Sequence, residues 1–153
     1  MTRAALFLDI DRVLLPIEDT SAWPDYTVID SPCGTVPMSP RLLAAVGALP
    51  ARIVYVTDWQ ADAKLLDVHL NRTDTEVAAR QVVDGWWKTR AIADYLASHP
   101  DVGTFIHADD HLHEERLEDL DRIAAGRPHL GVVPADGLTP ADIAAMQRFL
   151  VDA

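Results

Sequence analysis

Short apolar runs alternate with longer amphipathic segments along this chain. Four of the runs are predicted to be buried strands because they are short and almost continuously apolar or β-branched; they cover residues 4–8, 52–57, 103–108 and 129–133. The stretch 76–83 is less regular, and we expect a short strand near Val82 and Val83. Strands that alternate with helices at this spacing predict parallel β-α-β units, and therefore a layered α/β sheet in one domain spanning residues 1–153.

The amphipathic segments predict the helices between these strands. Ser39-Pro40 and Thr139-Pro140 each place an N-cap residue before a proline at the first helical position. Pro50 is expected to end the first of these helices. The other helices are predicted over 59–70, from Lys88 onward, and over 114–125.

One segment, residues 15–38, shows no clear periodicity. It contains four prolines and a glycine, which favour turns, together with Trp23 and Tyr26. A connection of this length is usually either disordered or functional, and its aromatic residues favour an ordered flap.

Composition and charge narrow the functional classes. The chain has 153 residues and a net charge of −11, which argues against a large nucleic-acid footprint, because such proteins usually display basic patches. Cys33 is the only cysteine, so neither a disulfide framework nor a cysteine-based zinc site is expected. No apolar run is long enough to span a membrane or to form a signal-peptide core, and a soluble, cytoplasmic protein without membrane partners is therefore predicted.

Reactive side chains follow several of the predicted strands. Asp9 and Asp11 come after the first strand, and side chains two positions apart in an extended segment point to the same side. Two like charges at such close range repel each other unless a cation or a proton is shared. Thr57 follows the second strand and Asp109-Asp110 follows 103–108. Because the carboxyl ends of parallel strands meet at one edge of a sheet, these groups are predicted to lie together there.

Phosphoryl transfer needs such a set of groups. A carboxylate can attack phosphorus, and Mg²⁺ prefers hard oxygen ligands such as Asp9, Asp109 and Asp110. The hydroxyl of Thr57 and the ammonium of Lys88 can hold the other phosphoryl oxygens while charge redistributes.

The order of these motifs resembles that of the haloacid dehalogenase (HAD) superfamily of phosphohydrolases. Residues 9–14 (DIDRVL) resemble its first motif, 55–57 (YVT) its second, and 105–110 (FIHADD) its acidic fourth, while Lys88 falls where the third-motif lysine would be. The tail from His129 through Pro140 also resembles small HAD-domain proteins that are common in actinobacteria.

The resemblance implies a fold and a set of roles. The fold would be a Rossmann-like three-layer α/β/α sandwich with a mainly parallel sheet. The enzyme would be a Mg²⁺-dependent phosphatase acting through an aspartyl-phosphate, with Asp9 as nucleophile and Asp11 as general acid and base. Thr57 and Lys88 would stabilise the phosphoryl group, and the metal ligands would be drawn from Asp9, Asp11, Asp109 and Asp110, with Asp109 the nearer of the last two. The gaps between motifs are too short for a full cap domain, so the site is expected to be open to a phosphorylated small molecule or polymer end.

Arg12 and Asp58 are candidate substrate contacts. The position after Asp11 is often glycine in this family, so Arg12 places a cation at the mouth of the site. Its guanidinium suits a second phosphate or a carboxylate on the substrate, and the alternative is that it pairs with a surface acid.

Other interpretations remain open. A catalytically silent HAD-like domain that binds a partner or a phospho-ligand would carry the same residues. A phospho-accepting receiver domain also uses acids, threonine and lysine, but it places the lysine last. His107, His111 and His113 would lack a further zinc ligand and are expected to be solvated. Trp86 and Trp87 are expected to pack before Lys88, the alternative being a nucleobase stacked on them.

Overall fold

A five-stranded parallel sheet forms the centre of the protein. The computed structural model describes residues 3–153. The sheet has the order β5-β4-β1-β6-β7, built from β1 (Arg3–Leu8), β4 (Arg52–Tyr55), β5 (Glu76–Val77), β6 (Val102–Ala108) and β7 (His129–Val132). The chain first adds strands on one side of β1 and then crosses to the other side to form β6 and β7. The point where the order reverses therefore lies between β1 and β6, which is where open α/β sheets bind ligands.

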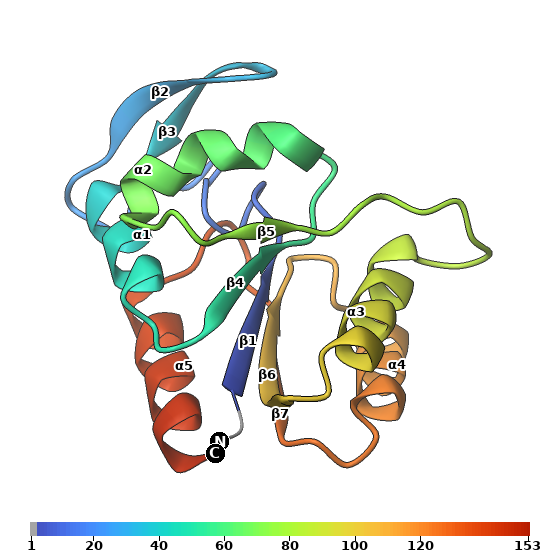
Figure 1. Ribbon diagram of the computed structural model, residues 1–153. Helices are drawn as coiled ribbons and strands as arrows, with labels where there is room; N and C mark the ends of the chain where they lie inside the picture. The colour runs from blue at the N-terminus through green and yellow to red at the C-terminus, as the bar shows by residue number, and fades with distance from the viewer. Residues whose placement is uncertain (1–2) are drawn as a thin grey trace.

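Helices cover both faces of this sheet (Figure 1), as the alternation of side chains along β1 requires. Leu6 and Leu8 pack into one core with α1 (Pro40–Gly47), α2 (Asp67–Leu70) and α5 (Pro140–Asp152). Ala5 and Phe7 point to the other face, against α3 (Trp87–Ser98) and α4 (Glu114–Ala124). The α/β class, the parallel sheet and the layered architecture predicted from the sequence are confirmed. None of the helices within residues 3–153 combines the length and the apolar character needed to cross a membrane.

Both predicted proline-containing helix starts are present. The Ser39 hydroxyl accepts a hydrogen bond from the Leu42 amide at 3.1 Å, and Thr139 forms a capping box with Asp142. The first helix ends at Gly47, before Pro50, where its backbone approaches α2 very closely. A Cβ atom on Gly47 would lie only 1.8 Å from the Leu70 carbonyl oxygen, so only glycine fits at this helix contact.

The structure corrects three local expectations. Segment 15–38 is not only loop, because β2 (Thr27–Ser31) and β3 (Gly34–Met38) pair as an antiparallel hairpin. Ile29 and Val36 of this hairpin pack against the core, and Gly34 has a φ of 108° beside the turn. Segment 59–70 begins as a 3₁₀ helix, η1 (Gln60–Leu66), before it becomes α2.

The third correction concerns the edge strand. The prediction of a strand near Val82 and Val83 was wrong, because β5 consists of Glu76 and Val77, which pair with Val54 and Tyr55. Val82 is fully exposed to solvent. The Gln60 side chain accepts a hydrogen bond from the Arg80 backbone, which lies beyond the end of β5. The valines therefore lie in a loop, although their β-branched side chains favour a strand.

Candidate active site

Asp9 and Asp109 extend two neighbouring strands across the point where the sheet order reverses. Leu8 and Ala108 are paired at the ends of β1 and β6, and the Asp9 amide donates a hydrogen bond to the Ala108 carbonyl at 3.1 Å. Parallel pairing therefore sets the two acids side by side. Both are buried, and Asp109 is completely inaccessible to solvent.

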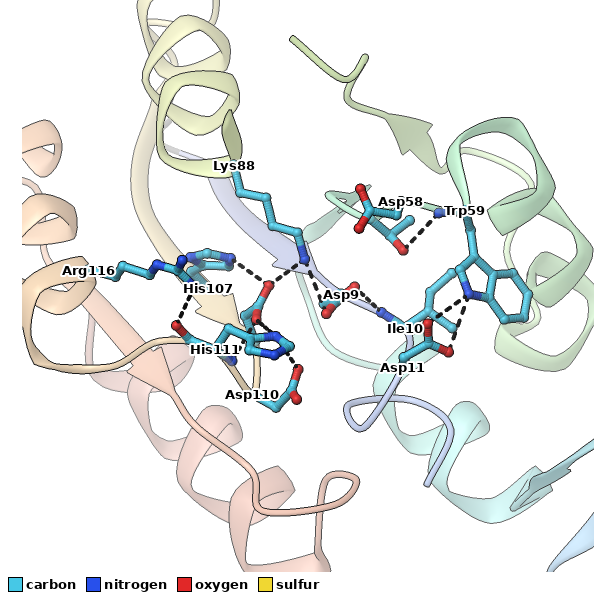
Figure 2. Close-up of polar contacts among 12 residues, drawn as sticks. Asp9, Ile10, Asp11, Asp58, Trp59, Lys88, His107, Asp110, His111 and Arg116 are labelled. Atoms are coloured by element: carbon cyan, nitrogen blue, oxygen red, sulfur yellow. Dashed lines mark hydrogen bonds and ion pairs between the residues drawn. The ribbon is translucent and has the colours of Figure 1, made fainter. Parts of the chain in front are cut away.

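The Lys88 side chain supplies the positive charge between these acids (Figure 2). Its Nζ lies 3.1 Å from Asp9 Oδ2 and 2.7 Å from Asp109 Oδ2. The ammonium is delivered from the first turn of α3 and is itself buried. Burial alone would lower the pKa of Lys88, but the two carboxylates raise it above its ordinary value. Lys88 is therefore charged at neutral pH.

Burial of the site leaves excess negative charge at its centre. Burial raises the pKa of Asp9 to about 6, with the charge of Lys88 opposing the rise and that of Asp109 adding to it. The pKa of Asp110 is also raised, again mainly by burial. One ammonium cannot neutralise three carboxylates, so this site favours the binding of a further cation.

Four side chains are close enough to share that cation. Asp9, Asp109, Asp110 and His111 each offer a ligand atom, and these atoms lie within 4.8 Å of one another. Asp110 Oδ1 is buried without a hydrogen-bond partner among residues 3–153; His111 Nδ1 lies 3.2 Å away but outside hydrogen-bond geometry. An orphaned carboxylate oxygen beside two further acids is a donor set that fits a divalent metal ion, and its oxygen-rich character suits Mg²⁺.

The two neighbouring acids of the fourth motif differ in how far they are already engaged. Asp109 Oδ1 accepts a hydrogen bond from the His111 amide at 2.8 Å, while its Oδ2 is held by Lys88. Asp110 keeps Oδ1 free of hydrogen bonds within the described residues. This geometry favours Asp110 over Asp109 as the acid with an oxygen available to a metal, the reverse of the order expected from the sequence.

Asp11 and Thr57 lie in the same pocket as Asp9 and Lys88 but outside the metal-binding group. The pocket measures about 340 Å³. Asp11 is exposed, and its carboxylate accepts a hydrogen bond from Trp59 Nε1 at 3.3 Å. Thr57 is buried and its hydroxyl accepts from the Trp59 amide. The sequence thus located four pocket residues together, with Asp11 separated from the acids that surround Asp110.

The two candidate substrate contacts are both paired with charged side chains. Asp58 lines the pocket and forms an ion pair with Arg80. Arg12 is not among the pocket-lining residues; its guanidinium lies 3.6 Å from Asp136 and 3.5 Å from Glu18. The geometry of Arg12 thus favours the pairing alternative.

Arg12 also has an unusual backbone conformation. Its φ is 60°, in the left-handed region that glycine adopts without steric cost, which accounts physically for glycine being common at this position. The Arg12 carbonyl accepts a hydrogen bond from the Gly137 amide, and Asp136 accepts from three consecutive amides of residues 17–19. These contacts fasten the loop after β1 to the loop before α5.

The expectation that the histidines are solvated is wrong for His107. Its imidazole is buried on β6, and neither ring nitrogen has a hydrogen-bond partner within the described residues. Burial lowers the pKa of His107 to about 4, so the ring is neutral at physiological pH. It stacks against Trp86, with ring centres 5.8 Å apart, which supports packing as a role for Trp86.

Three pocket residues escaped the sequence analysis: Arg80, His111 and Arg116. His111 could have been identified because it follows an acidic pair at a strand end. Arg80 and Arg116 carry no local signal, because one lies in an irregular loop and the other lies on a charged helix. None of the lining residues comes from the 15–38 segment, so the predicted flap does not line this pocket.

Comparisons with known proteins do not name a family. The search of protein-family models and the search of curated proteins each give no match to this chain.

Proposed function

We propose that this protein is a divalent-cation-dependent phosphohydrolase of the HAD type that cleaves phosphomonoesters through an aspartyl-phosphate on Asp9. The observation that carries the proposal is the Lys88 ammonium held between Asp9 and Asp109 in the pocket beside the carboxyl end of β1. Such an arrangement supplies a buried nucleophile, a fixed positive charge and an adjacent acidic metal-binding group.

The contacts of Asp9 suit a nucleophile that must be oriented before reaction. The Ile10 amide donates a hydrogen bond to Oδ1 at 2.8 Å, and Lys88 lies at 3.1 Å from Oδ2. Attack by an Asp9 oxygen forms an O–P bond as the bond from phosphorus to the leaving oxygen breaks. Lys88 and the hydroxyl of Thr57, both in the pocket, would stabilise the charge that spreads over the phosphoryl oxygens.

Asp11 is placed for proton transfer. It is exposed within the pocket, and Trp59 restrains its carboxylate. A protonated Asp11 would give its proton to the leaving oxygen. The resulting carboxylate would then take a proton from the water that attacks the phosphorus of the aspartyl-phosphate, which regenerates Asp9.

A metal ion bound by Asp9, Asp110 and neighbouring donors would neutralise phosphoryl charge. Mg²⁺ is the expected ion because carboxylates supply most of the donor set, and His111 leaves Mn²⁺ as the natural comparison.

The strand order weighs against the receiver-domain alternative. Numbered along the parallel sheet alone, the order here is 3-2-1-4-5, whereas receiver domains share the flavodoxin-like order 2-1-3-4-5. The silent-domain alternative differs only in turnover, and an activity measurement therefore decides it.

The test is hydrolysis of p-nitrophenyl phosphate with Mg²⁺ or Mn²⁺ and with excess chelator. Wild-type protein should release phosphate only with the metal, and acid-quenched protein should gain the mass of one phosphoryl group. Asp9→Asn should lose both signals while keeping its circular dichroism spectrum, and Asp30→Asn, an exposed acid on the hairpin, serves as the matched control. Phosphate binding without turnover under every metal condition would refute the enzyme and establish the binding domain.

A further inference from the structure

Arg116 is a pocket cation without an acidic partner. It lies on α4, lines the same pocket as Asp9 and Lys88, and is partly exposed. No carboxylate oxygen of residues 3–153 lies within 4.0 Å of its guanidinium, although the chain carries a net charge of −11. Arg80, the other arginine of the pocket, is already paired with Asp58.

The Arg116 side chain is nevertheless held in place. Its guanidinium carbon lies 4.0 Å from the ring centre of Trp86, and one of its nitrogens donates to the His111 carbonyl at 2.9 Å. Figure 2 shows Arg116 directed toward His107 and His111. A stacked arginine loses less conformational entropy on binding than a free one, and its remaining donors suit the paired oxygens of a phosphate.

The same contact argues against a nucleobase on Trp86. The indole carries Arg116 over its ring and also stacks with His107. A base would have to displace the guanidinium to reach the covered face. The wall of the pocket formed by Trp86 and Arg116 is therefore cationic, and it favours an anionic substrate group.

We infer that Arg116 binds a second phosphate on the substrate, so that the preferred substrates are small bisphosphates. The inference rests on the proposed function, since it places the scissile phosphate at Asp9 and Lys88. Lys88 Nζ lies 5.6 Å and the Arg116 guanidinium carbon 4.0 Å from the same Trp86 ring, so the two cations are no more than about 10 Å apart. Two phosphates on one sugar span such a distance.

The test compares matched substrates that differ only in the second phosphate. The pairs are fructose 1,6-bisphosphate with fructose 6-phosphate, and adenosine 3′,5′-bisphosphate with adenosine 5′-phosphate. Wild-type kcat/KM should favour the bisphosphate in at least one pair. Arg116→Gln keeps an amide able to donate to the His111 carbonyl and should lower kcat/KM for that bisphosphate by roughly 10- to 100-fold, the effect of losing a charge-assisted hydrogen bond. The matching monophosphate should change by less than about 3-fold.

Two further variants separate recognition from structure. Arg116→Lys keeps the charge and should retain part of the preference, whereas Arg122→Gln, an exposed arginine on the same helix, should change neither substrate. Equal loss on both members of a pair in Arg116→Gln would mean that Arg116 only supports the loop at residues 109–111, and would overturn the inference.

Binding measurements keep this inference distinct from the proposed hydrolysis. Calorimetry on Asp9→Asn with Mg²⁺ should show tighter binding of the bisphosphate, and the preference should disappear when Arg116→Gln is added. That result without turnover in wild type would support the second-phosphate site and refute the phosphohydrolase. Hydrolysis of aryl phosphate without any bisphosphate preference would do the opposite. A preference for a 5′-phosphorylated trinucleotide over every small bisphosphate would overturn the assignment to small molecules.

Discussion

Replacing Lys88 with methionine should destabilise the protein strongly, because it leaves two buried carboxylates without their counter-charge. Methionine has a similar length and no charge, so the change isolates the ammonium. The side chains of Asp9 and Asp109 are 9% and 0% exposed, and water cannot take over the lost contacts at 3.1 and 2.7 Å. Breaking a buried ion pair in this way costs about 3–5 kcal/mol. For a chain of 153 residues, the melting temperature should fall by about 6–20 °C.

The assay is urea unfolding without metal, followed by thermal melts with and without Mg²⁺. Arg90→Met removes an exposed arginine from its pair with Asp94 and should cost less than about 1 kcal/mol. Adding Asp109→Asn to Lys88→Met should recover part of the loss, because one uncompensated charge is removed with it. Mg²⁺ should stabilise Lys88→Met more than wild type, since it restores positive charge at the site. A loss below about 1 kcal/mol in Lys88→Met would refute the buried-charge reasoning.

Three further changes test other contacts. Asp110→Asn should reduce the rise in melting temperature caused by Mg²⁺, because it weakens the acid with the free oxygen; an unchanged rise would exclude Asp110 as a ligand. Asp136→Asn should cost about 1–3 kcal/mol near neutral pH. Burial alone would raise the pKa of Asp136, but backbone hydrogen bonds and Arg12 hold it below 3.8. Its contribution is therefore present above that value and lost as pH falls through the lowered pKa, so the difference from wild type in urea unfolding should shrink in acid. Arg12→Gly should change stability by less than about 1 kcal/mol, since relief of the positive φ offsets two ion pairs, and should leave the bisphosphate preference intact, unlike Arg116→Gln.

Local sequence signals predicted the elements that have strong periodicity or distinct ends. The apolar runs found β1, β4, β6 and β7, and the Ser39-Pro40 and Thr139-Pro140 pairs found two helix starts. Signals failed where a tertiary contact competes with propensity. Val82 and Val83 favour a strand, yet the edge pairing uses Glu76 and Val77, and Gln60 bonds the backbone beyond them.

The candidate site divides in the same way between local pattern and tertiary structure. The sequence by itself placed Asp9, Thr57 and Asp109 at strand ends, and parallel strands bring such ends to one edge whatever the details of packing. Only the tertiary structure decided that Lys88 reaches between Asp9 and Asp109, that Asp110 keeps a free oxygen, and that Arg12 turns away to Asp136. It also brought Arg116 from a charged helix into the pocket, stacked on Trp86. Strand ends are fixed by a period along the chain, whereas the direction and charge partners of a long side chain depend on neighbours distant in sequence, which no local pattern encodes.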